Sequence, residues 1–270
     1  MPFAHERVRG EHSVLLPFVR AAGDPHWPVG GCARAEGAAR LHRCGRDLHV
    51  VLHVAGDAHA VGRRTDSPEA LGVRRGLRQD EREIAGRLPR HAGVDIHRLD
   101  AGTSGLMIVA KSDRAYLKLK DMFRDHDVEK TYHALVQGHM DPVSGTIDAP
   151  IDRHPKEDHR FAVIAEGKES ITHYEVIEFY RSVSLVKVEL ETGRTHQIRV
   201  HLSALHHPLV GDLTYGSDPA LAKRLNISRP WLHAKQLGFD HPANGQRLSF
   251  TAEYPADLTR SLEVLSDISR

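Results

Sequence analysis

Residues 97–110 of this 270-residue chain read HRLDAGTSGLMIVA. The last five of these residues form an uninterrupted apolar run, which is typical of a short buried strand. Ahead of that strand lie the charged and polar side chains of His97, Arg98 and Asp100 and a Gly-Thr-Ser-Gly turn. A strand anchored in the core would hold this loop in place, and functional groups are often carried by such loops. On spacing alone, the alternative is a plain turn in which Asp100 accepts backbone hydrogen bonds.

Patterns of helix and strand alternate downstream of this loop. Ser112 can cap a helix. The apolar face of this helix consists of Tyr116, Leu119, Met122 and Phe123. Strands are predicted at residues 130–137, 171–180, 183–190, 233–239 and 248–252, a short helix at 195–205 and a C-terminal helix near 258–265. Strands joined by hairpin-length links, with few helices, indicate an α+β fold with a largely antiparallel sheet.

The first 90 residues differ in composition and in hydrophobic patterning from the rest of the chain. The first lysine is Lys111, and residues 1–95 contain 15 Arg and 8 His. The one apolar stretch, residues 48–54, is interrupted by two histidines. The absence of sustained periodicity predicts loop, disorder or poorly determined structure. We therefore expect an atypical segment over residues 1–90 and a folded domain over residues 91–270.

Composition excludes several classes of protein. With 37 basic and 36 acidic residues, the chain lacks the overall charge of a nucleic-acid binder. Two cysteines cannot form a disulfide framework or a four-cysteine zinc site. The 21 histidines lack Cys or carboxylate partners at usual ligand spacing, so a metal hydrolase receives little weight. Without a long apolar run or a signal-peptide core, a cytoplasmic protein with no membrane partner is expected.

A second polar segment, ETGRTHQIRVH at residues 191–201, leads into the short predicted helix. The opposite face of that helix is apolar. Arg199 follows Ile198 and could project toward a neighbouring carboxylate. The alternative is a solvated helix face that places His196 and His201 at the surface.

Taken in order, these segments resemble the RluA/RluD family of pseudouridine synthases. The resemblance extends over residues 97 to about 255 and includes KTYHALV at 130–136, HPLVGDLTYG at 207–216 and LHA at 232–234. It implies an enzyme that isomerises uridine to pseudouridine in structured RNA, without a metal or organic cofactor. Large-subunit ribosomal RNA is the commonest target in the family, and transfer RNA also occurs. The family's fold is a mixed, mainly antiparallel sheet with flanking helices and a cleft, and many members are monomers.

The resemblance assigns catalytic roles to three residues. Asp100 matches the family's catalytic aspartate, which either attacks the sugar or removes a C2′ proton. Arg199 matches the basic residue that pairs with this aspartate, and an adjacent cation stabilises the charged form and orients it. Tyr132 matches the active-site tyrosine, whose ring can stack on uracil and whose hydroxyl is a candidate base for the C5 proton. The alternative for Tyr132 is an ordinary core aromatic.

Three further basic residues are candidates for substrate binding. Arg98 matches a family residue that can occupy the gap left by an extruded uridine. Lys130 and Arg194 could contact phosphates, although either is equally compatible with solvated surface charge. His97 is interpreted as structural, with its ring bonded to the loop backbone.

The resemblance ends upstream of the aspartate loop. Family members usually have a strand followed by an Asn/Asp-Lys-Pro-x-Gly segment there, and neither this segment nor an S4 RNA-binding module has a counterpart in residues 1–90. Two hypotheses explain the difference: a divergent arm, or a misread frame or start. The missing segment also keeps open a second function, that of a non-catalytic RNA-binding relative with a retained cleft.

Overall fold

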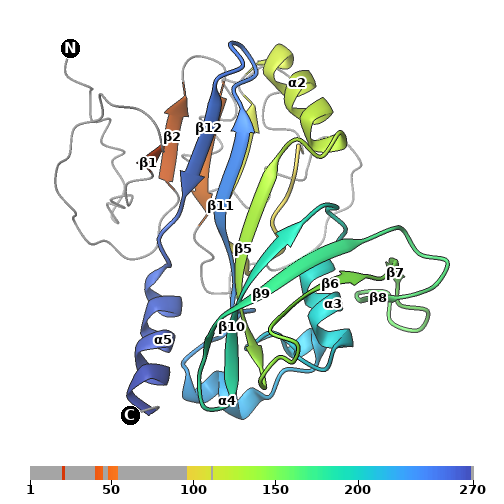
Figure 1. Ribbon diagram of the computed structural model, residues 1–270, viewed down its shortest axis with the longest axis vertical. Coiled ribbons are helices and arrows are strands. Elements are labelled where there is room, and N and C mark those ends of the chain that lie inside the picture. Colours follow the sequence, from red (N-terminus) through yellow and green to blue (C-terminus); the bar gives the residue numbers. More distant parts are fainter. Residues whose placement is uncertain (1–19, 22–39, 45–47, 54–95, 111, 269–270) are drawn as a thin grey trace, which may run out of the picture.

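The computed structural model describes residues 20–21, 40–44, 48–53, 96–110 and 112–268. Within them, ten strands form one sheet, in the order β2-β3-β4-β11-β5-β10-β9-β6, with β12 on β11 and β1 on β12 (Figure 1). The strands of the sheet are β1 (Arg20–Ala21), β2 (Arg40–Cys44), β3 (Leu48–His53), β4 (Ser104–Ala110), β5 (Glu129–Gln137), β6 (Ser144–Asp148), β9 (Ile171–Phe179), β10 (Val183–Leu190), β11 (Leu232–Asp240) and β12 (Arg247–Thr251). A separate hairpin consists of β7 (Ile151–Arg153) and β8 (Phe161–Val163). The helices are α2 (Asp113–Arg124), α3 (Gln197–Ala204), α4 (Pro219–Arg224) and α5 (Ala256–Ile268), with a 3-10 turn η2 (Leu213–Tyr215).

Every strand pairing in the described residues is antiparallel except that between β4 and β11. This parallel pair sets Ser104 beside His233 and Gly105 beside Ala234 at the starts of the two strands. The predicted α+β class with a mixed, mainly antiparallel sheet is therefore confirmed. The pairing also places the loop that carries Asp100 near the middle of the sheet.

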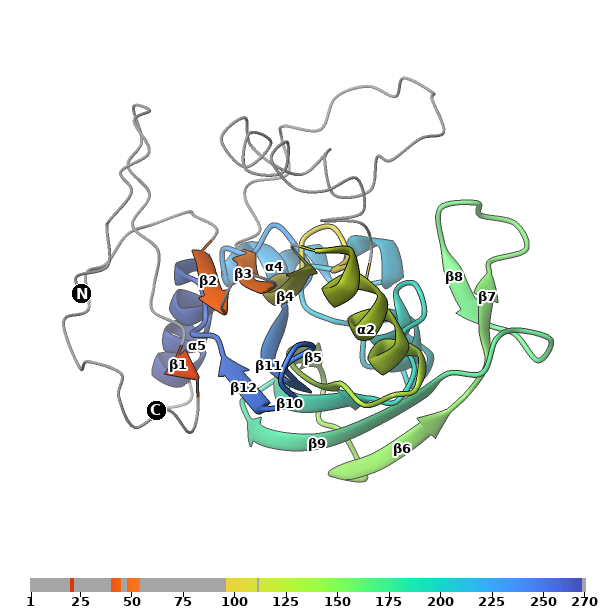
Figure 2. The ribbon, with the colours of Figure 1, turned by 90° about the horizontal axis from the view of Figure 1, so that it is seen from above.

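Helices cover the sheet and supply its apolar core. Leu119 of α2 packs with residues of β4, β11 and β12, whereas Ile198 of α3 packs with residues of β5 and β10. Leu258 of α5 joins a third cluster with Trp231 and Leu225. Figure 2 shows the curvature of the sheet and the β7–β8 hairpin standing apart from it. In the described part of the chain, no helix is both long and apolar enough to cross a membrane.

Most elements downstream of residue 100 match their predicted positions. The Ser112 hydroxyl accepts a hydrogen bond from the Ala115 N–H, as expected of the cap of α2. The predicted strands correspond to β5, β9, β10, β11 and β12. The short helix α3 ends at Ala204, so Leu205 is 38% exposed and does not extend its apolar face as the spacing predicts.

Strands also occur in the segment for which no regular structure is predicted. β2 and β3 form a hairpin, and β3 pairs with β4 from Leu48↔Ala110 to His53↔Gly105. These residues thus differ from the expectation of loop or disorder, because pairing with a buried neighbour supplies the order. The remaining residues of 1–90 lie outside the described part, and the division at residue 90 stays a prediction.

Candidate active site

Asp100 lies on a tight turn that its own backbone closes. The Asp100 carbonyl accepts a hydrogen bond of 2.9 Å from the Thr103 N–H. Gly102, at the third position, has a φ of +89°, which a type II turn requires and glycine adopts without steric cost. The Asp100 side chain is 24% exposed. The turn therefore fixes the backbone and leaves the carboxylate within reach of a ligand.

Arg199 approaches this carboxylate from the first turn of α3. Its Nη1 lies 3.6 Å from Asp100 Oδ2, so the predicted proximity of the two residues is present in the structure. The bidentate fork of Arg199 is directed elsewhere, with Nε 2.6 Å and Nη2 2.9 Å from the two carboxylate oxygens of Asp212. Arg199 thus supplies positive charge to Asp100 without engaging both of its oxygens in a fork.

Asp212 is a residue of this site that sequence reasoning missed. It lies inside the quoted segment HPLVGDLTYG, and its only signal is a single acid among mainly apolar residues. Asp212 directly precedes η2, and its side chain is 1% exposed. Burial alone would lower the pKa of Arg199. The hydrogen bonds to Asp212 and the negative charges of Asp212 and Asp100 have a larger combined effect, so the pKa is raised. Asp212 therefore keeps a buried guanidinium charged and orients it.

Tyr215 and His196 form a wall beside this ion pair. The Arg199 guanidinium lies 4.8 Å from the centre of the Tyr215 ring, a cation–π geometry. The Tyr215 hydroxyl is 2.8 Å from His196 Nδ1 and accepts the Phe161 N–H from β8 at 3.1 Å. Burial lowers the pKa of His196, and Arg199 lowers it further, against the opposing charges of the two aspartates. The imidazole is therefore neutral at neutral pH.

Tyr132 lies on β5 and packs with Ile198 and Leu232 in the apolar core. Its burial, and to a smaller extent the charge of Asp100, raise the pKa of the phenol well above its ordinary value. The hydroxyl is therefore protonated at neutral pH. Tyr132 is thus a core aromatic that is close enough to Asp100 to be affected by its charge, and its role at the uracil stays a prediction.

The three predicted substrate-binding residues occupy different places. Arg98 is exposed and lies two residues before Asp100. Lys130 is half-buried with its ammonium 5.8 Å from the centre of the Phe123 ring, and burial lowers its pKa. Arg194 is exposed and donates from Nε to the Glu169 carbonyl at 2.9 Å. The structure therefore gives Lys130 and Arg194 partners away from Asp100, and their substrate roles stay predictions.

His97 and His201 both have structural partners. The Ile108 N–H donates to His97 Nε2 at 3.0 Å, and the ring stacks on Phe123. Burial, with a smaller effect of Lys130, lowers the pKa of His97 to about 4. His201 is fully buried, contrary to the surface alternative, and bonds Thr172 and the Ala149 carbonyl.

Among the described residues, no three His, Cys, Asp or Glu side chains gather as they would around a metal ion.

Comparisons with known proteins show which family this chain is similar to. A family model described as RNA pseudouridylate synthase matches residues 78–204. An uncharacterized RNA pseudouridine synthase of Mycobacterium bovis is 58% identical over 170 residues, which cover 63% of this chain and 55% of that protein. Ribosomal large subunit pseudouridine synthase D of Escherichia coli K12 is 40% identical over 187 residues, covering 66% of this chain and 56% of that protein.

A solved structure extends the similarity to the fold. The structure of human RNA Pseudouridylate Synthase Domain Containing 1 has a TM-score of 0.62 and 29% identity, covering 82% of this chain and 87% of that one. The chain spans little more than half the length of the curated relatives that it matches. The matching family model, the similarity to relatives and the shared fold together support the RluA/RluD family of RNA pseudouridine synthases for this chain.

Proposed function

We propose that this protein isomerises uridine to pseudouridine in RNA and that Asp100 is its catalytic carboxylate. The observation that carries the proposal is the partly exposed Asp100 on a closed turn, with Arg199 Nη1 3.6 Å from its Oδ2. The Arg199 guanidinium supplies positive charge beside this carboxylate. Similarity to the family supplies the class of reaction, and the geometry supplies a charged, accessible group suited to it.

The reaction needs such a group at the sugar. The N1–C1′ bond of the uridine breaks, the uracil turns, and a C5–C1′ bond forms, after which C5 loses its proton and N1 carries one. Ionised Asp100 can start this sequence by attack on C1′ or by removal of the C2′ proton. Either route requires a carboxylate that is held in place and has a free oxygen. This requirement is met because Arg199 donates its two short hydrogen bonds to Asp212 and not to Asp100.

Tyr132 is assigned to the uracil ring. Aromatic side chains offer stacking surfaces for extruded bases. Because burial raises the pKa of its phenol, Tyr132 must give up its proton before it can accept the C5 proton. Stacking on uracil needs no change in the protonation of Tyr132, so we assign this role to its ring first.

RNA binding is assigned to two exposed basic side chains, Arg98 and Arg194. Extruding a base from a stem costs a few kcal/mol, and the planar guanidinium of Arg98 could offset part of that by occupying the gap. Arg194, exposed ahead of α3, is a candidate for phosphate contact. We propose large-subunit ribosomal RNA as the substrate, in the cytoplasm, because several relatives are named for that RNA.

Tritium release tests the proposal. RNA labelled with tritium at uracil C5 loses the label only when C5 gains its bond to the sugar and gives up its hydrogen. We expect release by the wild type and by Asp240→Asn, which alters an exposed carboxylate on β11, and none by Asp100→Asn. Unchanged release by Asp100→Asn would contradict the role of Asp100. Binding of the RNA by the wild type without release would identify a non-catalytic RNA-binding protein instead.

A further inference from the structure

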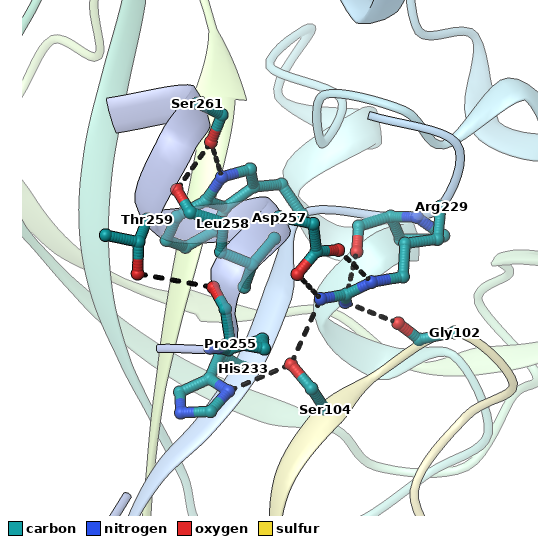
Figure 3. Close-up of polar contacts among 11 residues, drawn as sticks. Gly102, Ser104, Arg229, His233, Pro255, Asp257, Leu258, Thr259 and Ser261 are labelled. Atoms are coloured by element: carbon teal, nitrogen blue, oxygen red, sulfur yellow. Dashed lines mark hydrogen bonds and ion pairs between the residues drawn. The ribbon is translucent and has the colours of Figure 1, made fainter. Parts of the chain in front are cut away.

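Arg229 lies beneath the turn that carries Asp100, in the segment between α4 and β11. Its side chain is 7% exposed, and its Nη1 donates to the Gly102 carbonyl at 2.7 Å (Figure 3). The other side of the guanidinium meets Asp257, with Nε and Nη2 2.8 Å and 3.1 Å from its two oxygens. A buried, bidentate arginine therefore anchors the backbone two residues after Asp100.

The same guanidinium reaches the start of β4. Nη2 lies 3.4 Å from Ser104 Oγ, and this hydroxyl is 2.9 Å from His233 Nδ1 (Figure 3). Both Ser104 and His233 are fully buried. Arg229 thus contacts the chain on either side of Thr103, whose N–H closes the turn on the Asp100 carbonyl.

The neighbouring residue completes this support. A Cβ placed on Gly102 would lie 3.1 Å from Pro230 Cδ, so the turn rests directly on the segment that contains Arg229. Asp257, which holds Arg229, lies in the first turn of α5. The C-terminal helix is therefore linked to the turn by one ion pair and one hydrogen bond.

We propose that Arg229, held by Asp257, is a positioning residue that fixes the Asp100 turn and so directs the carboxylate toward the bound nucleotide. The proposal rests on the proposed function of Asp100. Side-chain contacts alone do not hold Asp100 tightly, because its distance to Arg199 is 3.6 Å and about a quarter of its side chain is exposed. Its direction then depends on the backbone, and the backbone depends on the anchor at Gly102.

Kinetics of four variants test this role. Large-subunit ribosomal RNA labelled with [5-³H]uridine is the substrate, and kcat and KM are measured separately. Because a displacement of about 1 Å can cost about 100-fold in rate, we expect Arg229→Ala to lower kcat about 100-fold with KM nearly unchanged. Arg229→Lys keeps the charge but not the fork and should give an intermediate kcat, as should Asp257→Asn.

Arg247→Ala is the matched control for these variants. Arg247 also pairs with a carboxylate, Asp240, but on β12, toward the far end of β11 from His233. Its kcat should equal that of the wild type. Wild-type kcat in Arg229→Ala, or an equal loss in Arg247→Ala, would overturn the proposal. Where Arg229→Ala does not fold, Arg229→Lys and Asp257→Asn carry the same test.

Hydrogen exchange supplies a readout that does not depend on activity. The Thr103 amide is protected by its bond to the Asp100 carbonyl. In Arg229→Lys and Asp257→Asn we expect its exchange to rise about tenfold through local opening of the turn, with protection in β5 and β10 unchanged. Unchanged exchange at Thr103, or an equal rise in all strands, would overturn the positioning role. Absence of tritium release by the wild type would instead contradict the proposed function and leave the exchange result to decide whether Arg229 holds the turn.

Discussion

Asp212→Asn removes one charge from the buried pair with Arg199 and nearly conserves the shape of the side chain. Asp212 is 1% exposed and Arg199 7% exposed, so water cannot replace the lost carboxylate readily. Arg199 donates two hydrogen bonds to the charged carboxylate, at 2.6 Å and 2.9 Å. Asparagine offers only one acceptor oxygen, and that oxygen carries no full charge. The change therefore leaves a buried guanidinium poorly compensated.

The expected cost follows from these contacts. Breaking a buried ion pair by removing one partner costs about 3–5 kcal/mol, and the bond that asparagine retains returns about 1 kcal/mol. We therefore expect the free energy of unfolding to fall by about 3 kcal/mol, or about 6–12 °C in melting temperature for a domain of this size. The released guanidinium also has Asp100 as its nearest remaining carboxylate, 3.6 Å away. A closer pair would occupy the oxygen that the reaction needs, so kcat should fall as well.

Thermal denaturation and tritium release measure the two effects. Asp240→Asn is the control, because Asp240 pairs with Arg247 at 3.3 Å and both side chains are about half exposed. Exposed pairs contribute about 0–1 kcal/mol, so the control should melt within about 4 °C of the wild type. Equal melting temperatures for Asp212→Asn and Asp240→Asn would refute the reasoning. So would a normal kcat in Asp212→Asn.

Two further variants test the support of the loop. Because the pKa of His97 is lowered to about 4, the unfolded chain binds a proton below pH 6.5 that the folded protein does not, and stability falls as pH decreases from about 6.5 to about 4. Between pH 7 and pH 5 this loss is about 2 kcal/mol, and denaturation of His97→Gln should lack it; identical pH dependence in the two proteins would contradict this. Gly105→Ala should destabilise by at least about 2 kcal/mol, because φ is +114° and a Cβ would lie 2.2 Å from the Ala234 carbonyl oxygen. Gly193→Ala meets nothing within 4 Å and should melt like the wild type, and equal melting of the two alanine variants would count against the strain.

The sequence predicts those elements whose signals are local. Ser112 and the spacing of apolar residues after it specify α2, and two apolar runs separated by a short link specify the β9–β10 hairpin. The β2–β3 hairpin is different, because two histidines interrupt the pattern of residues 48–54 and its order depends on pairing with β4. Such long-range pairing leaves no periodic signal in the strand itself.

The site residues also differ in whether the sequence alone could identify them. Asp100 and Arg199 could be identified because their segments resemble a known family, and the structure brings them together. The roles of Asp212 and Arg229 depend on distances that the sequence does not contain. Arg229 and Gly102 are 127 residues apart in the chain, and only the fold shows that one anchors the other.

The most direct test is to quantify the product nucleoside. Large-subunit ribosomal RNA lacking modifications is incubated with the wild type or with Asp100→Asn, digested, and its nucleosides separated by chromatography. We expect a new pseudouridine peak, with an equal loss of uridine, from the wild type alone. Pseudouridine formed in equal amount by Asp100→Asn would contradict the central claim that this carboxylate carries the isomerisation.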